Sequence, residues 1–171
     1  MIVPLSLHFN WVLVLGVDPG LARTGYAVVS RGSPHRVIAM GVISTPVKWP
    51  LENRLQELAG DLSDVIRRYQ PGALALEKVY IKGNRSAASA VERATGVVML
   101  TSAEAGIPVR EYIPSTIKKG VTGDGRATKE VVQRSLSKTL RLSENSLPHD
   151  AFDAVAVAIC HLQHLHLEIV T

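Results

Sequence analysis

The sequence predicts a single α/β domain with a mixed five-stranded sheet, and three features of its first half predict it. Residues 12–18 form an apolar run that ends in Asp18 and is followed by Pro-Gly, the pattern of a strand buried on both faces. Two more apolar segments follow after short turns, which predicts an antiparallel meander. An amphipathic segment then leads into a fourth apolar run, and this order favours a right-handed parallel crossover. The fourth strand is therefore expected beside the first.

The meander and the first helix account for residues 12–69. Residues 25–31 are expected to form the second strand and residues 36–44 the third. A helix is expected from about Pro50 to Tyr69, because apolar residues recur at spacings of three and four along one face. These residues are Leu51, Leu55, Leu58, Leu62, Val65 and Tyr69.

The rest of the chain is expected to be mostly helical. Pro71 and Gly72 end the first helix, and residues 73–76 form the fourth strand, which runs into Glu77. The elements expected after it are a loop over 78–85, an alanine-rich helix over 86–105, a fifth strand over 109–112, a short helix over 114–119, a glycine-rich loop over 120–127, a helix over 128–140, a loop over 143–148 and a helix over 149–164. The last helix is apolar almost all round, so we expect it to pack against the sheet.

Length and composition limit the class of protein. A chain of 171 residues is most simply one domain, which we expect over residues 12–171, with residues 1–11 as an N-terminal extension. No apolar run approaches the roughly 20 residues that a membrane span needs. The single cysteine, Cys160, excludes an internal disulfide and favours a location in the reducing cytoplasm, with the thiol buried.

The charge of the chain favours anionic partners. The net charge is +4 and the pI is about 9.4. Two groups of basic residues lie in or beside predicted loops: Lys78, Lys82, Arg85 and Arg93, and then Lys118, Lys119, Arg126 and Lys129. Charge alone is equally consistent with phosphate contacts and with an ordinary solvated surface.

Four acidic residues share one expected location. Asp18 and Glu77 end neighbouring parallel strands, so their carboxylates are expected at the same edge of the sheet. Asp150 and Asp153 are three residues apart on an otherwise apolar helix, which places them on one face. Each acid alone has an ordinary explanation as a turn residue, a helix N-terminal charge or an ion-pair partner. Together they would repel one another and favour Mg²⁺ or Mn²⁺, and a pair of ions about 4 Å apart suits in-line hydrolysis of a phosphodiester.

Three blocks of sequence carry a resemblance to a known family. They are Leu-Gly-Val-Asp-Pro-Gly-Leu-Ala-Arg-Thr-Gly-Tyr around Asp18, Leu-Ala-Leu-Glu-Lys-Val-Tyr around Glu77, and His-Asp-Ala-Phe-Asp-Ala-Val-Ala-Val-Ala around Asp153. With these blocks in this order over residues 12–165, the chain resembles the RuvC-type Holliday junction resolvases. The resemblance implies a ribonuclease H-like fold, a homodimer, and symmetric nicking of two like-polarity strands at a four-way DNA junction in recombination and repair. It also implies the branch-migration proteins RuvA and RuvB as partners.

The same resemblance implies which residues form the active site. Asp18, Glu77, Asp150 and Asp153 occupy the family's four catalytic and metal-binding positions, with two Mg²⁺ or Mn²⁺ ions per site. Some members carry His at the third position, where this chain has Asp150 preceded by His149.

Basic and aromatic residues are expected to hold the DNA. Lys118 and Lys129 match family lysines near the active site, where a cation stabilises charge on the scissile phosphate. Tyr80 matches a family aromatic that acts at the junction centre, where it can stack on an exposed base. The further candidate DNA contacts are Lys82, Asn84, Arg85, Lys119 and Arg126.

Other functions remain as alternatives. An ATP-binding protein of the actin and Hsp70 type also places Asp and Gly after a first strand, but that fold needs two copies of the unit and a second phosphate loop. A non-catalytic junction-binding protein needs the basic loops but not four acids. A nuclease of the same fold that cleaves RNA–DNA hybrids is disfavoured by Tyr80 and the two lysines through resemblance only.

Two sets of polar residues are given structural roles. Arg23 and Thr24 are expected in the turn near the site. His161, His164 and His166 are expected to be structural or exposed, because His161 lies roughly 12 Å along the helix from Asp153.

Overall fold

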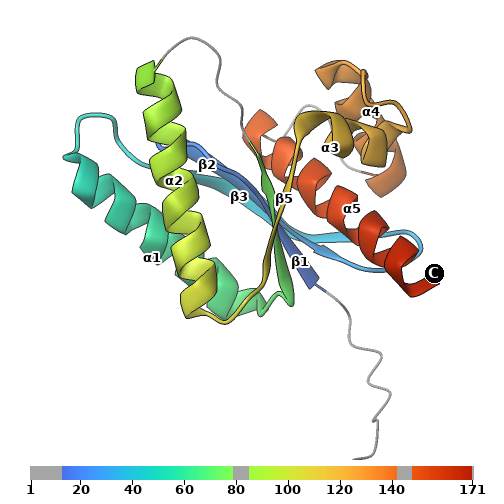
Figure 1. Ribbon diagram of the computed structural model, residues 1–171, viewed down its shortest axis with the longest axis horizontal. Helices are drawn as coiled ribbons and strands as arrows, with labels where there is room; N and C mark the ends of the chain where they lie inside the picture. The colour runs from blue at the N-terminus through green and yellow to red at the C-terminus, as the bar shows by residue number, and fades with distance from the viewer. Residues whose placement is uncertain (1–12, 79–84, 142–147, 171) are drawn as a thin grey trace, which may run out of the picture.

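The computed structural model describes residues 13–78, 85–141 and 148–170. The expected extension over residues 1–11 therefore lies outside the described residues. The elements are, in chain order, β1 (Leu13–Asp18), β2 (Arg23–Ser30), β3 (Arg36–Ser44), α1 (Leu51–Tyr69), β4 (Ala73–Glu77), α2 (Arg85–Glu104), β5 (Val109–Tyr112), α3 (Pro114–Thr122), α4 (Lys129–Leu140) and α5 (His149–Val170). The sheet lies between α1 and α2 on one side and α5 with α3 and α4 on the other (Figure 1).

The sheet has five strands in the order β3-β2-β1-β4-β5. Strand β2 is antiparallel to both β1 and β3, which confirms the predicted meander. Strand β4 is parallel to β1 and to β5, so the expected crossover is confirmed as well. The two strands that end in acids are therefore neighbours.

Strand β1 contributes to two hydrophobic cores because its side chains alternate between the two faces of the sheet. Leu15 and Val17 pack with the α1 and α2 side, whereas Val14 packs with α5. Helix α5 lies across this second face, and every residue from Ala151 to Leu162 except Asp153 is buried. This burial confirms that α5 packs against the sheet, as its apolar sequence predicted.

Helix α5 approaches the sheet closely at two glycines. A Cβ atom on Gly16 of β1 would lie 2.1 Å from the carbonyl oxygen of Ala154, and one on Gly25 of β2 would lie 1.9 Å from that of Asp150. Any other residue would push the helix away from the strands. The start of α5 therefore lies directly over strands β1 and β2, close to Asp18 at the end of β1.

Three element boundaries differ from the prediction by more than one residue, and one of them is the end of α5, which reaches Val170 instead of residue 164. Arg23 and Thr24 are the first residues of β2 and are paired with β3, so they are not turn residues. The hydroxyl of Thr24 donates a bond to the carbonyl of Gly20, so the turn between β1 and β2 ends before Arg23. Helix α3 continues to Thr122, so the first part of the expected 120–127 loop is helical, and the helix ends where Gly123 takes a left-handed conformation.

Two further expectations concern membranes and the buried helix side chains. Within the described residues, none of the helices has the length and apolarity that a membrane crossing requires. Cys160 is buried, which raises the pKa of its thiol to about 12. His161 is buried with its Nδ1 atom 2.7 Å from the Tyr112 hydroxyl, and the Nδ1 atom of His164 bonds the Cys160 carbonyl oxygen.

Candidate active site

Two acids of the site come from the ends of adjacent strands. Val17 of β1 is paired with Leu76 of β4, so the next residues, Asp18 and Glu77, lie side by side at the end of the parallel pair. Asp18 is also directly opposite Gly25 of β2. By the alternation of strand side chains, Asp18 and Glu77 project from the face of the sheet that α5 covers.

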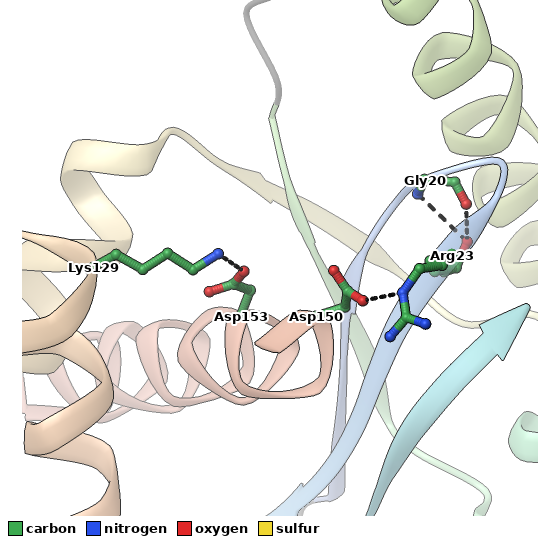
Figure 2. Close-up of polar contacts among 6 residues, drawn as sticks. Gly20, Arg23, Lys129, Asp150 and Asp153 are labelled. Atoms are coloured by element: carbon green, nitrogen blue, oxygen red, sulfur yellow. Dashed lines mark hydrogen bonds and ion pairs between the residues drawn. The ribbon is translucent and has the colours of Figure 1, made fainter. Parts of the chain in front are cut away.

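The other two acids come from the start of α5. Asp150 lies in its first turn, and Asp153 is three residues further on, so both project from the same side of the helix. Figure 2 shows the two carboxylates turned in opposite directions. The Oδ2 atom of Asp150 accepts a bond from Nε of Arg23 at 2.7 Å, and the Oδ2 atom of Asp153 accepts one from Nζ of Lys129 at 2.6 Å.

Electrostatics show that the four acids lie close enough to affect one another. Burial is the main cause that raises the pKa of Asp18 to about 7, and the charges of Glu77, Asp153 and Asp150 raise it further, against an opposing effect of Lys129. The pKa of Glu77 is raised as well, first by burial and then by Asp153. The ionised site is therefore costly for the protein, because two partly buried carboxylates face further negative charge.

Lysine residues lower part of this cost. The positive charges of Lys129 and Lys118 act to lower the pKa of Glu77. Burial acts to lower the pKa of Lys129 itself, but its hydrogen bond with Asp153 and the charges of three acids raise it above its usual value. Lys129 is therefore a permanent cation at the edge of the acidic site.

Part of the site lines a cleft of about 260 Å³ between β4, α3, α4 and α5, whose lining does not include Asp18 or Asp150. Its polar walls carry Glu77, Asp153, Lys118 and Lys129. Its apolar walls are Pro114, Ile117, Val132 and Ala156. Acids and lysines that are distant in the sequence thus face the same space, which is open to a ligand.

The chemistry of these side chains suits a divalent metal ion. All four candidate ligands are carboxylates, the oxygen donors that Mg²⁺ and Mn²⁺ prefer. Positive charge would relieve the repulsion that, after burial, raises the pKa of Asp18 and Glu77. Within the described ranges, no three acidic, His or Cys side chains are already grouped around one ion position. In this structure one oxygen of Asp150 is bonded to Arg23 and one oxygen of Asp153 to Lys129.

Not all the candidate DNA contacts lie at this cleft. Lys119 lines a separate cavity with Gln163 and His164, on another side of α3 from Lys118. Arg126 is exposed, and its backbone N–H is bonded to Asp124, so it is a surface residue outside the cleft lining. Tyr80, Lys82 and Asn84 lie outside the described residues, as does the side chain of Arg85, whose backbone begins α2.

The structure adds Arg23 to the site and separates His149 from it. Arg23 was expected to be a turn residue, and only its ion pair with Asp150 places it among the acids. His149 is exposed, and its Nδ1 atom lies 3.1 Å from Nε2 of Gln133 on α4. Of these two neighbours at the start of α5, Asp150 is the one that acts electrostatically on Asp18.

The chain is similar to known proteins of one family over most of its length. Residues 14–161 match the family model described as crossover junction endodeoxyribonuclease RuvC. The chain belongs to the RuvC family. It is 43% identical over 151 residues to the RuvC protein of Thermomicrobium roseum, a match that covers 88% of this chain and 93% of the relative. It is 41% identical over 153 residues to the RuvC protein of Desulforamulus reducens, covering 89% of this chain and 94% of that one.

A solved structure of the family has the same fold. The structure of T. thermophilus RuvC in complex with a Holliday junction substrate superposes with a TM-score of 0.86 at 30% identity, over 92% of this chain and 96% of that chain. The mixed five-stranded sheet with helices on both faces is thus the ribonuclease H-like fold that the resemblance implied. The expectation of a crossover junction endodeoxyribonuclease of the RuvC family is confirmed.

Proposed function

We propose that this chain resolves four-way DNA junctions by paired, symmetric nicks, and that the four acids and two lysines described above form its active site. The observation that carries the proposal is the meeting of Asp18, Glu77, Asp150 and Asp153, where burial, and after it the charge of neighbouring carboxylates, raises the pKa of the two strand-borne acids. Family membership and the junction-bound relative support the choice of substrate.

The four carboxylates would hold two Mg²⁺ or Mn²⁺ ions. Asp18 and Glu77 are fixed by strand pairing, whereas Asp150 and Asp153 are on the first turns of a helix and can exchange their present partners. When bound, such ions lower the pKa of a coordinated water and stabilise the leaving 3′ oxygen.

The lysines have a separate task on the substrate. Lys118 and Lys129 face the cleft beside the acids, so their ammonium groups can contact a phosphate that enters it. A cation at this place stabilises the negative charge that develops on the phosphate during in-line attack. The apolar walls around Ile117 and Val132 limit access of water on that side.

The remaining features of the proposal concern assembly. A homodimer would present two such sites to the two strands of a junction, and RuvA and RuvB would be its partners in the cytoplasm. Residues 12–171 would form the nuclease domain, with residues 1–11 as an extension. Tyr80, Lys82, Asn84, Arg85, Lys119 and Arg126 would contact DNA outside the catalytic cleft.

Nicking assays on labelled four-way junction, duplex and RNA–DNA hybrid substrates test the proposal. Wild-type protein should nick the junction in opposed strands when Mg²⁺ or Mn²⁺ is present and should not cleave in EDTA. Asp18→Asn should bind the junction with unchanged affinity and fail to nick it, whereas Asp64→Asn, on the exposed surface of α1, should nick normally. Nicking by Asp18→Asn at the wild-type rate would refute the metal site, and preference for the hybrid would refute the substrate.

A further inference from the structure

Arg23 is placed at the acidic site by the strand it begins. Residues 23 and 25 are two apart in β2 and therefore project from the same face of the sheet. At Gly25 the missing side chain admits the first turn of α5, which brings Asp150 over β2. Arg23, next along that face, meets the carboxylate with its Nε atom 2.7 Å from Oδ2 (Figure 2).

The backbone around Arg23 is well supported. Arg23 pairs with Ser44 of β3, and the buried hydroxyl of Thr24 donates a bond of 2.7 Å to the Gly20 carbonyl. The turn before it is tied to β3 as well, because the N–H of Thr45 bonds the carbonyl of Ala22 at 3.1 Å. The ion pair is thus built on a fixed strand, while both charged groups remain accessible: the side chains of Arg23 and Asp150 are 55% and 31% exposed.

Asp150 therefore takes part in two interactions that compete for its carboxylate. Its charge acts on Asp18, so it belongs to the acidic site, yet one of its oxygens is bonded to a guanidinium. A carboxylate oxygen engaged by Arg23 is hindered from binding a metal ion, and the arginine charge repels that ion. Lys129 engages Asp153 from inside the cleft, whereas Arg23 approaches from the opposite side of the two acids (Figure 2).

We propose that Arg23 is a positioning residue that holds Asp150 away from the metal position and so weakens binding of divalent ions to the protein alone. This inference rests on the metal site of the proposed function. Loading of the site then requires an exchange in which Asp150 leaves the guanidinium for the ion. Because the pair is half exposed, the competition is modest, and its loss should tighten ion binding about two- to fivefold.

Direct titration of Mn²⁺ tests this role without any cleavage assay. The electron paramagnetic resonance signal of free Mn²⁺ is followed as it is added to DNA-free protein at pH 8, for wild type, Arg23→Gln, Asp150→Asn and the double variant. Arg23→Gln should bind Mn²⁺ about two- to fivefold more tightly than wild type. Arg23→Met, which keeps the apolar stem, should agree with it, and circular dichroism verifies that each variant is folded.

The double-mutant cycle separates contact with Asp150 from a simple loss of charge. In the Asp150→Asn background, Arg23→Gln should leave the Mn²⁺ affinity nearly unchanged, because the carboxylate through which it acts is gone. An equal gain in both backgrounds, or no gain in either, would overturn the proposal. Arg67→Gln, which removes an arginine from the exposed Asp64 pair on α1, is the matched control and should leave Mn²⁺ binding unchanged.

The outcome also distinguishes this inference from the proposed function. Wild-type protein that binds Mn²⁺ with no effect of Arg23→Gln retains the metal site and refutes only the role of Arg23. Wild-type protein that binds no Mn²⁺ refutes the metal site, and the role of Arg23 with it.

Discussion

Replacement of Asp18 by Asn should stabilise the metal-free protein above neutral pH. The pKa of Asp18 is raised from its ordinary value of 3.8 to about 7 by burial and by Glu77, Asp153 and Asp150. A group whose pKa is higher in the folded state favours folding less as the pH rises. Its penalty is absent below about pH 4, grows as the pH passes from 4 to 7, and is complete above pH 7. Asn at this position carries no such penalty.

The size of the effect follows from the pKa. A difference of about three pH units corresponds to about 4 kcal/mol at 25 °C. We expect about 2–4 kcal/mol, because neighbouring carboxylates in the wild type also take up protons and relieve part of the repulsion. The relevant quantity is the change, between pH 4 and pH 8, in the difference between the free energies of unfolding of Asp18→Asn and wild type.

Urea unfolding followed by circular dichroism in EDTA, at pH 4, 5, 6, 7 and 8, measures this quantity. The difference should grow with pH and level off near pH 8, while Asp64→Asn, on the exposed surface of α1, should differ from wild type by a constant amount. Mn²⁺ should then raise the stability of the wild type at pH 8 more than that of Asp18→Asn. If the difference in the free energy of unfolding between Asp18→Asn and wild type stays constant within about 0.5 kcal/mol from pH 4 to pH 8, the argument that ionised Asp18 destabilises the metal-free protein is refuted.

Three further predictions concern the lysine, the close helix contact and the aromatic residue. Lys129→Gln should slow nicking about 10²–10³-fold under single-turnover conditions with little loss of junction affinity in gel shifts, and a parallel loss of both would contradict a role on the reacting phosphate. Gly25→Val should lower the free energy of unfolding by at least about 1–3 kcal/mol and weaken Mn²⁺ binding, since its Cβ would lie 1.9 Å from the Asp150 carbonyl oxygen; unchanged values for both would show that α5 can move without loss. Tyr80→Ala should reduce junction nicking while the melting temperature stays within about 2 °C of wild type, and equal turnover of the two proteins would exclude the stacking role.

The positions of the acids could be predicted because each follows from a strong local pattern. Asp18 and Glu77 end apolar runs, and the handedness of a strand–helix–strand crossover then makes those strands neighbours. Asp153 interrupts a helix that is otherwise buried from Ala151 to Leu162, so its polarity stood out in the sequence. These predictions needed only periodicity and topology.

The position of Arg23 could not be predicted from the same signals. The apolar pattern of β2 begins after Arg23, and its partner Asp150 is 127 residues away in the chain. Their contact depends on how closely α5 approaches β2, which is set by the space at Gly25 and not by any periodic feature. The sequence shows only that Arg23 stands two positions before Gly25. This spacing does not indicate a contact with Asp150 unless the position of α5 is known.

The different positions of the Lys118 and Lys119 side chains could have been predicted from the sequence. Successive residues of an α-helix point about 100° apart, so adjacent lysines on α3 cannot both face one narrow cleft. Lys118 faces the acids, and Lys119 faces the cavity beside Gln163. The helical pattern of residues 114–119 therefore already implied that one of the two would lie elsewhere.

The four acids divide into two pairs that differ in how they respond to a cation. Asp18 and Glu77 are fixed by strand pairing and carry the electrostatic penalty, whereas Asp150 and Asp153 are on a helix and are already bonded to Arg23 and Lys129. Arg23 and Lys129 are bonded directly to the helix-borne pair, whereas Lys129 acts on Asp18 and Glu77 only through its charge and leaves their pKa raised. A divalent ion bound beside the strand-borne pair would offset the remaining repulsion, so metal binding should stabilise the wild type, and Asp18→Asn should lose most of that stabilisation. The ionised carboxylate of Asp18 lowers the stability of the metal-free protein, and the same carboxylate would bind the metal that activity needs. Stability and activity therefore make opposite demands on this residue.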